Sequence, residues 1–267
     1  MTTMRRLLLV LLMLFAPAAA QAQGFDHGGW DALVKRHVVV VRGGASSQVR
    51  YDGMARDRAA LKGYLASAAK VSRATFDGWS KPDQLAFLIN VYNAATVDLV
   101  LTGYPGIASI RDLGSLIQGP WSKPVVSLFG KMVTLDNIEH DMIRGSGRYN
   151  DPRIHFAVNC ASIGCPALAT SAYRGATLNA QLEAATRAFL GDRTRNRVQG
   201  NGVAVSSIFK WYRGDFEKGW RGARSLPAFL ALYGDRLGLS PAATAQAKAG
   251  KLSISYLDYD WRLNKAG

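Results

Sequence analysis

Apolar residues recur along the chain in blocks whose spacing predicts mainly helices. The stretch Asp52–Val71, rich in Ala, Leu and Arg, predicts a first long helix. A second helix is predicted to begin beside Pro82, with Ser80 or Lys81 ahead of it, because proline is favoured in the first turn of a helix. From Leu85 to Leu101 this helix is apolar on almost every side, so we expect it to lie buried in the centre of the fold.

The remaining elements predict small groups of strands among further helices. "VVSLFGKMVTL" (125–135) predicts a hairpin that turns at Gly130, and a helix follows it, with Asp136 and Glu139 at a spacing compatible with a capping box. The other predicted elements are a buried strand at 153–159, a helix at 178–190, paired strands near 198 and at 203–205, helices that begin at Ser225 and Ser240, and a terminal strand at 253–264. The class is therefore α+β, a helix-rich single domain over residues 23–267 with a small antiparallel sheet.

Residues 1–22 have the pattern of a secretory signal peptide. A basic start precedes the apolar run from Leu7 to Phe15, and Ala20-Gln21-Ala22 matches the A-x-A cleavage pattern. The run is shorter than the roughly 20 residues that span a bilayer, and no later segment is long enough either. We therefore expect an exported protein, periplasmic or extracellular, without a transmembrane segment after cleavage.

The composition predicts a packed core and a basic surface. Hydrophobic residues make up 48% of the chain and charged residues 19%. Removing Arg5 and Arg6 with the signal lowers the formal net charge from +14 to +12. The basic residues are scattered, with "RTRNR" (193–197) as the one tight cluster. In an exported protein this charge favours anionic lipids, lipopolysaccharide or cell-wall polymers over nucleic acid. The expected partner is thus a cell-envelope polymer, a peptide or a small molecule.

Two polar features interrupt the apolar pattern. Asn90 and Asn93 share one face of the central helix, where buried amides must find hydrogen-bond partners. Glu139 falls inside the apolar arc of the helix after Asp136, and His140 falls at its edge. A carboxylate that faces the core is expected to be paired or to have a raised pKa.

Five motifs in order resemble the family called domain of unknown function 547. They are "DQLAFLINVYNAATV", "LDNIEHDMIR", "DPRIHFAVNCASIGCPAL", "VSSIFKWYRGDF" and "YDWRLN", which together extend from about Trp30 to Asn264. No activity is generally assigned to this family, so the resemblance implies a fold more than a function. The positions that match the family pattern are Asn90, Asn93, Glu139, His140, His155, Asn159 and Cys160, whereas Cys165 is the more variable of the two cysteines.

The first functional hypothesis is a thiol-dependent hydrolase or acyl transferase that acts on an amide bond. Cys160 would be the nucleophile, His140 the base, and Asn90 or Glu139 the group that orients the histidine. These parts resemble a papain-like or transglutaminase-like site in a permuted order, which is allowed because such sites are defined by geometry. On a straight strand His155 would lie about 16 Å from Cys160, too far to serve the same thiol.

The remaining candidate residues are assigned to binding. Trp211 and Trp261 could line a groove for an extended peptide or glycan. The polar candidates are Asn93, His155 and Asn159.

The second hypothesis is a non-enzymatic envelope module that binds an anionic or peptide ligand. Two cysteines in an exported protein usually pair, so Cys160–Cys165 would be a structural disulfide. The histidines would then be core residues, and the buried asparagines would only hold loop backbone. No cofactor motif appears. The spacing of Glu139, His140, His155 and Cys160 does not support a metal site.

Overall fold

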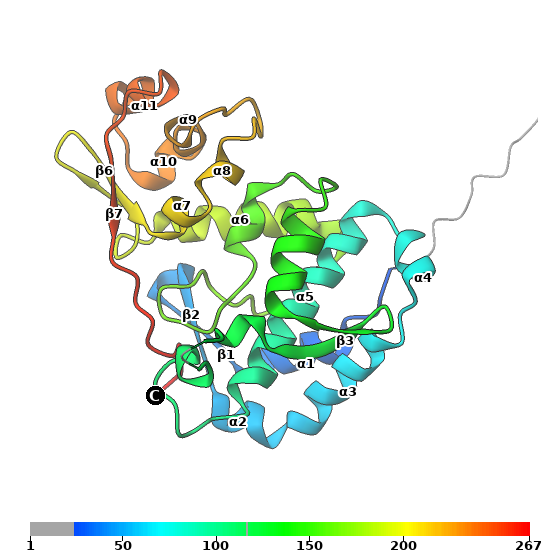
Figure 1. Cartoon of the computed structure of the whole chain (residues 1–267). Helices are drawn as coiled ribbons and strands as arrows, with labels where there is room; N and C mark the ends of the chain where they lie inside the picture. Colours follow the sequence, from blue (N-terminus) through cyan, green and yellow to red (C-terminus); the bar gives the residue numbers. More distant parts are fainter. Residues whose placement is uncertain (1–23, 116) are drawn as a thin grey trace, which may run out of the picture.

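Helix α5 (Lys81–Val100) lies among the other helices of a computed structural model that describes residues 24–115 and 117–267 (Figure 1). Ser80 is its N-cap, since its side chain accepts a hydrogen bond from the backbone N–H of Asp83. The helix is buried along nearly its whole length, as its apolar sequence predicts. The fold is helix-rich α+β, which confirms the predicted class.

Shorter helices pack around α5. They are α1 (Gly28–His37), α2 (Tyr51–Arg56), α3 (Arg58–Ala69) and α4 (Arg73–Asp77). The single helix predicted over 52–71 is interrupted at Asp57. The Asp57 carboxylate is held there by Arg36 at 2.7 Å and His37 at 2.8 Å, both on α1. A contact with a distant element therefore divides a segment that looks continuous in sequence.

Three small sheets contain the strands of the described residues. They are β1 (Val38–Val41) with β2 (Ser46–Val49), β3 (Pro124–Leu128) with β4 (Lys131–Thr134), and β5 (Arg197–Gln199), β6 (Gly202–Ser206) and β7 (Ile254–Leu257). The predicted 125–135 hairpin is confirmed, and Gly130 makes its turn at φ 78°. β1–β2 and β5–β6 are antiparallel too, and only β7 departs from the antiparallel prediction, because it pairs parallel with β6 after a long helical crossover. The predicted terminal strand is also too long, since β7 ends at Leu257 and the residues after it make only isolated bridges, from Leu263 to Ser162 and from Lys265 to Val49.

The strand predicted at 153–159 is wrong. Residues Pro152–Phe156 form the 3₁₀ helix η5 instead. Its first turn is set by Pro152 and by the Asp151 side chain, which accepts a hydrogen bond from the backbone N–H of Arg153. A short buried apolar run fits a strand and a helical turn equally well, so the pattern alone could not distinguish them.

The helix predicted after Asp136 is present, but its form differs. Asn137–Arg144 is a π-helix, η4, and the capping box is wrong because Asp136 makes no side-chain cap. Its carboxylate instead accepts a hydrogen bond from the Ser122 hydroxyl at 2.5 Å. Single-turn π segments are uncommon and are frequently found at functional sites.

The C-terminal third forms a second group of helices at the upper left of Figure 1. They are α6 (Leu178–Gly191), α7 (Ile208–Trp211), α8 (Arg213–Phe216), α9 (Leu226–Ala231), α10 (Gly234–Leu237) and α11 (Pro241–Lys248). The predicted starts at Ser225 and Ser240 are confirmed, because both serines cap their helices. The remaining 3₁₀ segments are η1 (Arg42–Gly44), η2 (Ile110–Leu113), η3 (Pro120–Ser122) and η6 (Gly175–Thr177).

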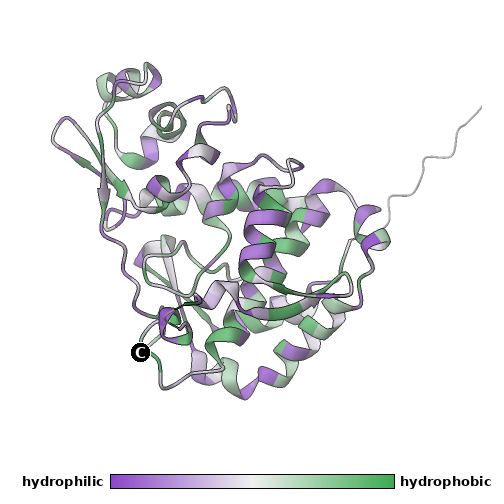
Figure 2. Ribbon diagram, in the orientation of Figure 1, coloured by the Kyte–Doolittle hydropathy of each residue, from purple (hydrophilic) through white to green (hydrophobic). Residues whose placement is uncertain are grey.

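Buried hydrophobic residues form two clusters, one around α5 and one among the C-terminal helices. Helix α6 contributes to both, with Leu182 in the first and Phe189 in the second. The η5 turn does the same through Ile154 and Phe156. Figure 2 shows hydrophilic and hydrophobic residues on the same helices, as expected where one face packs and the other meets solvent.

Two expectations concern membranes and export. The signal peptide predicted at 1–22 lies outside the described residues. Within 24–115 and 117–267, none of the helices combines the length and the apolar character that crossing a bilayer requires.

His27 lies near the start of the described residues, and its environment leads us to expect that the folded protein loses stability in acid. Its Nδ1 is hydrogen-bonded to the Tyr64 hydroxyl at 2.8 Å, and burial, then the Arg174 charge, lower its pKa to about 4. A lowered histidine pKa means that the unfolded chain takes up the proton first, so stability falls as pH drops below about 6.5. Between pH 7 and pH 4 we expect this residue to account for about 3 kcal/mol of lost stability.

Urea unfolding of His27→Gln at several pH values measures that contribution. The variant is expected to lose less stability than the natural protein over the same pH range. Equal pH slopes for the two proteins would contradict the assignment.

Candidate functional site

A cleft of about 210 Å³ opens between the two hydrophobic clusters. Its aromatic walls come from Tyr92 of α5, Trp121 of η3, Trp211 and Tyr212 beside α7, and Tyr259 and Trp261 near the C-terminus. Its polar groups are Asp136, Glu139, His140, His155, Cys160 and Cys165. Seven candidates from the sequence therefore line one cleft: Glu139, His140, His155, Cys160, Cys165, Trp211 and Trp261.

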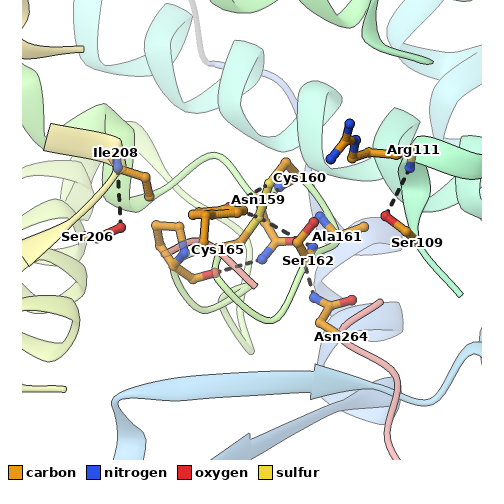
Figure 3. The surroundings of a disulfide bond; sticks show 12 residues. Ser109, Arg111, Asn159, Cys160, Ala161, Ser162, Cys165, Ser206, Ile208 and Asn264 are labelled. Atoms are coloured by element: carbon orange, nitrogen blue, oxygen red, sulfur yellow. Dashed lines mark hydrogen bonds between the residues drawn. A yellow bond between two sulfur atoms is a disulfide. The ribbon is translucent and has the colours of Figure 1, made fainter. Parts of the chain in front are cut away.

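Cys160 and Cys165 form a disulfide at the wall of this cleft (Figure 3). The Cys165 sulfur accepts a hydrogen bond from the backbone N–H of Cys160 at 3.0 Å. The Tyr259 hydroxyl lies 3.1 Å from the Cys160 sulfur and 3.2 Å from that of Cys165. Burial raises the pKa of Tyr259, so its hydroxyl keeps the proton that it donates to the sulfurs.

Asn159 shapes the loop that carries the disulfide and does not line the cleft. Its amide nitrogen donates to the Pro166 carbonyl at 2.7 Å, and its amide oxygen accepts from the Ala161 N–H at 2.9 Å. Ala161 lies at φ 63°, a left-handed conformation that needs such local support in a residue other than glycine. Figure 3 shows Asn159 among Cys165, Ala161 and Asn264.

Asn90 and Asn93 also lie outside the cleft. Asn90 donates to the Tyr173 carbonyl at 2.8 Å and accepts from the Tyr173 N–H at 2.9 Å. Asn93 donates to the Ala157 carbonyl at 2.9 Å and accepts from the Asn159 N–H at 2.8 Å. Both amides therefore bind loop backbone to α5, and neither contacts a histidine.

His155 and Asp215 form the most buried polar pair at the cleft. The His155 Nε2 lies 2.8 Å from an Asp215 carboxylate oxygen, and its ring stacks on Tyr212 with centroids 4.1 Å apart. The His155 Nδ1 is buried and has no hydrogen-bond partner. Burial lowers the pKa of His155, although the Asp215 contact acts in the opposite direction. The imidazole is therefore neutral near pH 7, with Nε2 as donor and Nδ1 as a free acceptor.

Asp215 is held by three partners. Besides His155, Arg144 lies at 2.5 Å and Lys218 at 2.8 Å. Burial opposes its ionisation, but hydrogen bonds from these three residues outweigh burial and hold the pKa of Asp215 well below its usual range. The carboxylate is charged, and it fixes the orientation of the His155 ring.

His140 lies on the solvent side of the same network. Its side chain is 40% exposed, its Nδ1 is 2.6 Å from Arg144, and its Nε2 is 3.6 Å from Asp136. Both ring nitrogens therefore have neighbours. Of the two histidines at the cleft, His155 has the unpartnered nitrogen, whereas the sequence favoured His140 as the base.

Glu139 is buried, as its place in the apolar arc predicts, with 6% of its surface exposed. After burial itself, its charge is the main cause that raises the pKa of Tyr212 and of Tyr92, so all three side chains lie together. In the described part of the chain, no ion pair joins Glu139 to a lysine, arginine or histidine.

The sequence did not single out Tyr92, Trp121, Asp215 or Tyr259 as site residues, although two motifs contain signals for them. Asp215 and Tyr212 stand in "IFKWYRGDF", and Tyr259 directly precedes "DWRLN". A spacing of three residues places Tyr212 and Asp215 on one side of a helical turn, and His155 contacts both. Which distant histidine they would meet depends on the tertiary fold. Among the residues that the structure describes, no group of three or more His, Cys, Asp or Glu has the arrangement of a metal site.

Comparison with protein families relates this geometry to known sequences. Residues 76–190 match the family described as a protein of unknown function, DUF547. This segment is similar to the DUF547 family. The match is shorter than the region that the sequence motifs suggested, and the searches of curated proteins and of solved structures found no match. The DUF547 segment supplies Glu139, His155 and the disulfide, and the chain beyond it supplies Tyr212 and Asp215.

Proposed function

We propose that the cleft is the active site of a thiol-dependent hydrolase or acyl transferase that acts on an amide bond, in which Cys160 is the nucleophile once its disulfide is reduced. The observation that carries this proposal is that Cys160 and His155 line one open cleft, and that Asp215 is hydrogen-bonded to His155 at 2.8 Å. His155 replaces His140 as the proposed base. Asp215 replaces Asn90 and Glu139 as the group that orients it.

The proposed chemistry begins with an external dithiol. It reduces Cys160–Cys165 by two electrons, is itself oxidised to a disulfide, and leaves two thiols on the protein. Nδ1 of His155 takes the Cys160 proton, and the thiolate attacks the amide carbonyl. The same nitrogen then gives the proton to the leaving amine. The thioester that remains is resolved by water or by an acceptor amine.

Cys165→Ala tests the proposal without added reductant, since it leaves Cys160 as a free thiol. The rate of Cys160 alkylation by iodoacetamide, followed by intact mass at pH 6, reports the thiolate fraction. We expect His155→Gln in this background to slow alkylation about tenfold, because a thiol pKa raised by one unit lowers the thiolate fraction by that factor. His140→Gln is the matched control and is expected to change the rate less than twofold.

Two outcomes would contradict this assignment. In one, His155→Gln leaves the rate unchanged in a protein that melts normally. In the other, Cys160 of Cys165→Ala titrates like an ordinary thiol, near pH 8.5. The second measurement needs no histidine variant, so it stands even if His155→Gln fails to fold.

The disulfide itself favours a second candidate function, a non-enzymatic module that binds a peptide or an envelope polymer. With the sulfurs bonded, the cleft still offers aromatic walls, and Trp211 remains 47% exposed at its rim. An ordinary thiol pKa together with ligand binding by the oxidised protein would favour this function. For either function, the signal-like sequence at 1–22 supports our proposal of an exported protein.

A further inference from the structure

Glu139 is a buried carboxylate whose neighbouring cations are already engaged. Arg144 and Lys218 both pair with Asp215, and the neutral His155 ring is hydrogen-bonded to the same carboxylate. The described residues place no ion-pair partner beside Glu139, although its side chain lines an open cleft. Burying an ionised carboxylate without a counter-charge is costly, so a cation that entered the cleft would be strongly attracted.

The hydroxyl groups next to this carboxylate provide only partial compensation. Tyr92 and Tyr212 lie close enough for the Glu139 charge to raise their pKa values, after burial, so both phenols stay protonated. A protonated phenol can donate one hydrogen bond but carries no charge. The two phenols therefore leave the Glu139 carboxylate without a cationic partner among the described residues.

The cleft walls also present aromatic ring faces, which attract cations. Trp211 and Trp261 stack with centroids 5.7 Å apart, and Tyr259 lies 4.5 Å from Trp261. Two of the cleft rings already hold a guanidinium: Arg144 lies 4.6 Å from the Tyr212 centroid, and Arg111 lies 5.3 Å from that of Trp261. Such contacts stabilise cations by roughly 0.5–2 kcal/mol each.

We propose that Glu139 and these rings form a subsite for an alkylammonium group, so that the substrate or ligand of the cleft carries a protonated amine. This inference deepens the proposed function, on which it rests for the amide part of the substrate. The cleft volume of about 210 Å³ is below the 300–1,000 Å³ typical of drug-sized ligands, which suits one amino-acid side chain. The amine belongs to a lysine-type side chain or to the N-terminus of a peptide.

Three small probes test whether the cleft recognises the charge of the ligand or only its shape. They also distinguish a side-chain amine from the α-amine of a peptide. N-acetyl-lysine methylamide carries only a side-chain ammonium, norleucine methylamide carries only an α-ammonium, and N-acetyl-norleucine methylamide is neutral. Binding is followed by quenching of tryptophan fluorescence, because Trp121, Trp211 and Trp261 line the cleft. The oxidised protein is used, so the result does not depend on a free thiol and is independent of the alkylation test.

We expect at least one charged probe to bind about tenfold or more tightly than the neutral probe. Glu139→Gln keeps the shape of the side chain and is expected to abolish this preference. Glu217→Gln removes a carboxylate outside the cleft, where Glu217 is paired with Arg213 at 2.9 Å, and is expected to retain it.

Three results would overturn the inference: equal binding of all three probes, no binding of any of them, or a preference that persists in Glu139→Gln. The comparison of probes on the natural protein needs no substitution, so it decides the question even if Glu139→Gln fails to fold. If the natural protein shows no preference for the charged probes, but Cys160 in Cys165→Ala is alkylated at the rate expected of an activated thiol, the ammonium subsite is rejected. The thiol proposal then stands.

Discussion

Replacing Asn93 with alanine is expected to lower the free energy of unfolding by about 4 kcal/mol. The amide joins α5 to the Ala157–Asn159 segment through two buried hydrogen bonds of 2.9 and 2.8 Å. Alanine would leave the Ala157 carbonyl and the Asn159 N–H without partners, at about 1–3 kcal/mol each. Urea unfolding monitored by circular dichroism measures the difference.

Asn201→Ala is the matched control for this change. Asn201 is exposed in the turn between β5 and β6, so the same substitution there is expected to change stability by less than about 0.5 kcal/mol. A loss below about 1 kcal/mol at Asn93 would show that water or a local shift satisfies the freed backbone groups. The loop would then not depend on this amide.

Replacing Asp215 with asparagine is the second change with a large expected effect. Asparagine keeps the shape but removes the charge that holds Arg144 and Lys218 and orients His155. Breaking a buried ion pair from one side typically costs about 3–5 kcal/mol. We expect a loss in that range at pH 7, together with the tenfold fall in Cys160 alkylation predicted for His155→Gln.

The pH dependence of this loss provides a check on its cause. The folded pKa of Asp215 is depressed, so its contribution is fully present above its unfolded pKa of about 3.9. The contribution is lost progressively as pH falls from that value towards the depressed folded pKa, so the difference between the natural protein and the variant should shrink in acid. Thermal unfolding at pH 7 and in acid measures this, with Asp77→Asn as control. The Asp77 pair with Arg73 is exposed on both sides, so about 0.5 kcal/mol or less is expected. An equal loss at both pH values would assign the effect to packing.

The elements that the sequence predicted well carry their own local signals. Ser80 and Pro82 mark the start of α5, Gly130 marks the hairpin, and Ser225 and Ser240 begin their helices as caps. Each signal acts within a few residues, so no knowledge of the rest of the fold is needed. The α+β class follows from these elements.

The parts that failed depend on contacts far along the chain. The segment that carries His155 has no local preference strong enough to select a strand over a helical turn, and the incorrect strand placed His155 too far from Cys160 to serve it. The parallel pairing of β7 depends on where the helical crossover returns. The sequence did predict that Glu139 is buried, because its helical position was clear. It could not predict that Asp215 would engage the nearby cations and leave Glu139 without one.

The arrangement of the cleft also limits how the chain can be divided. A fragment that ends at residue 190, where the family match ends, would contain Cys160, Glu139 and His155. It would have neither the ring that His155 stacks on nor the carboxylate that orients it, because Tyr212 and Asp215 come later. The unit that sequence comparison recognises is thus smaller than the unit that builds the cleft. Studies of activity therefore need the chain through Trp261.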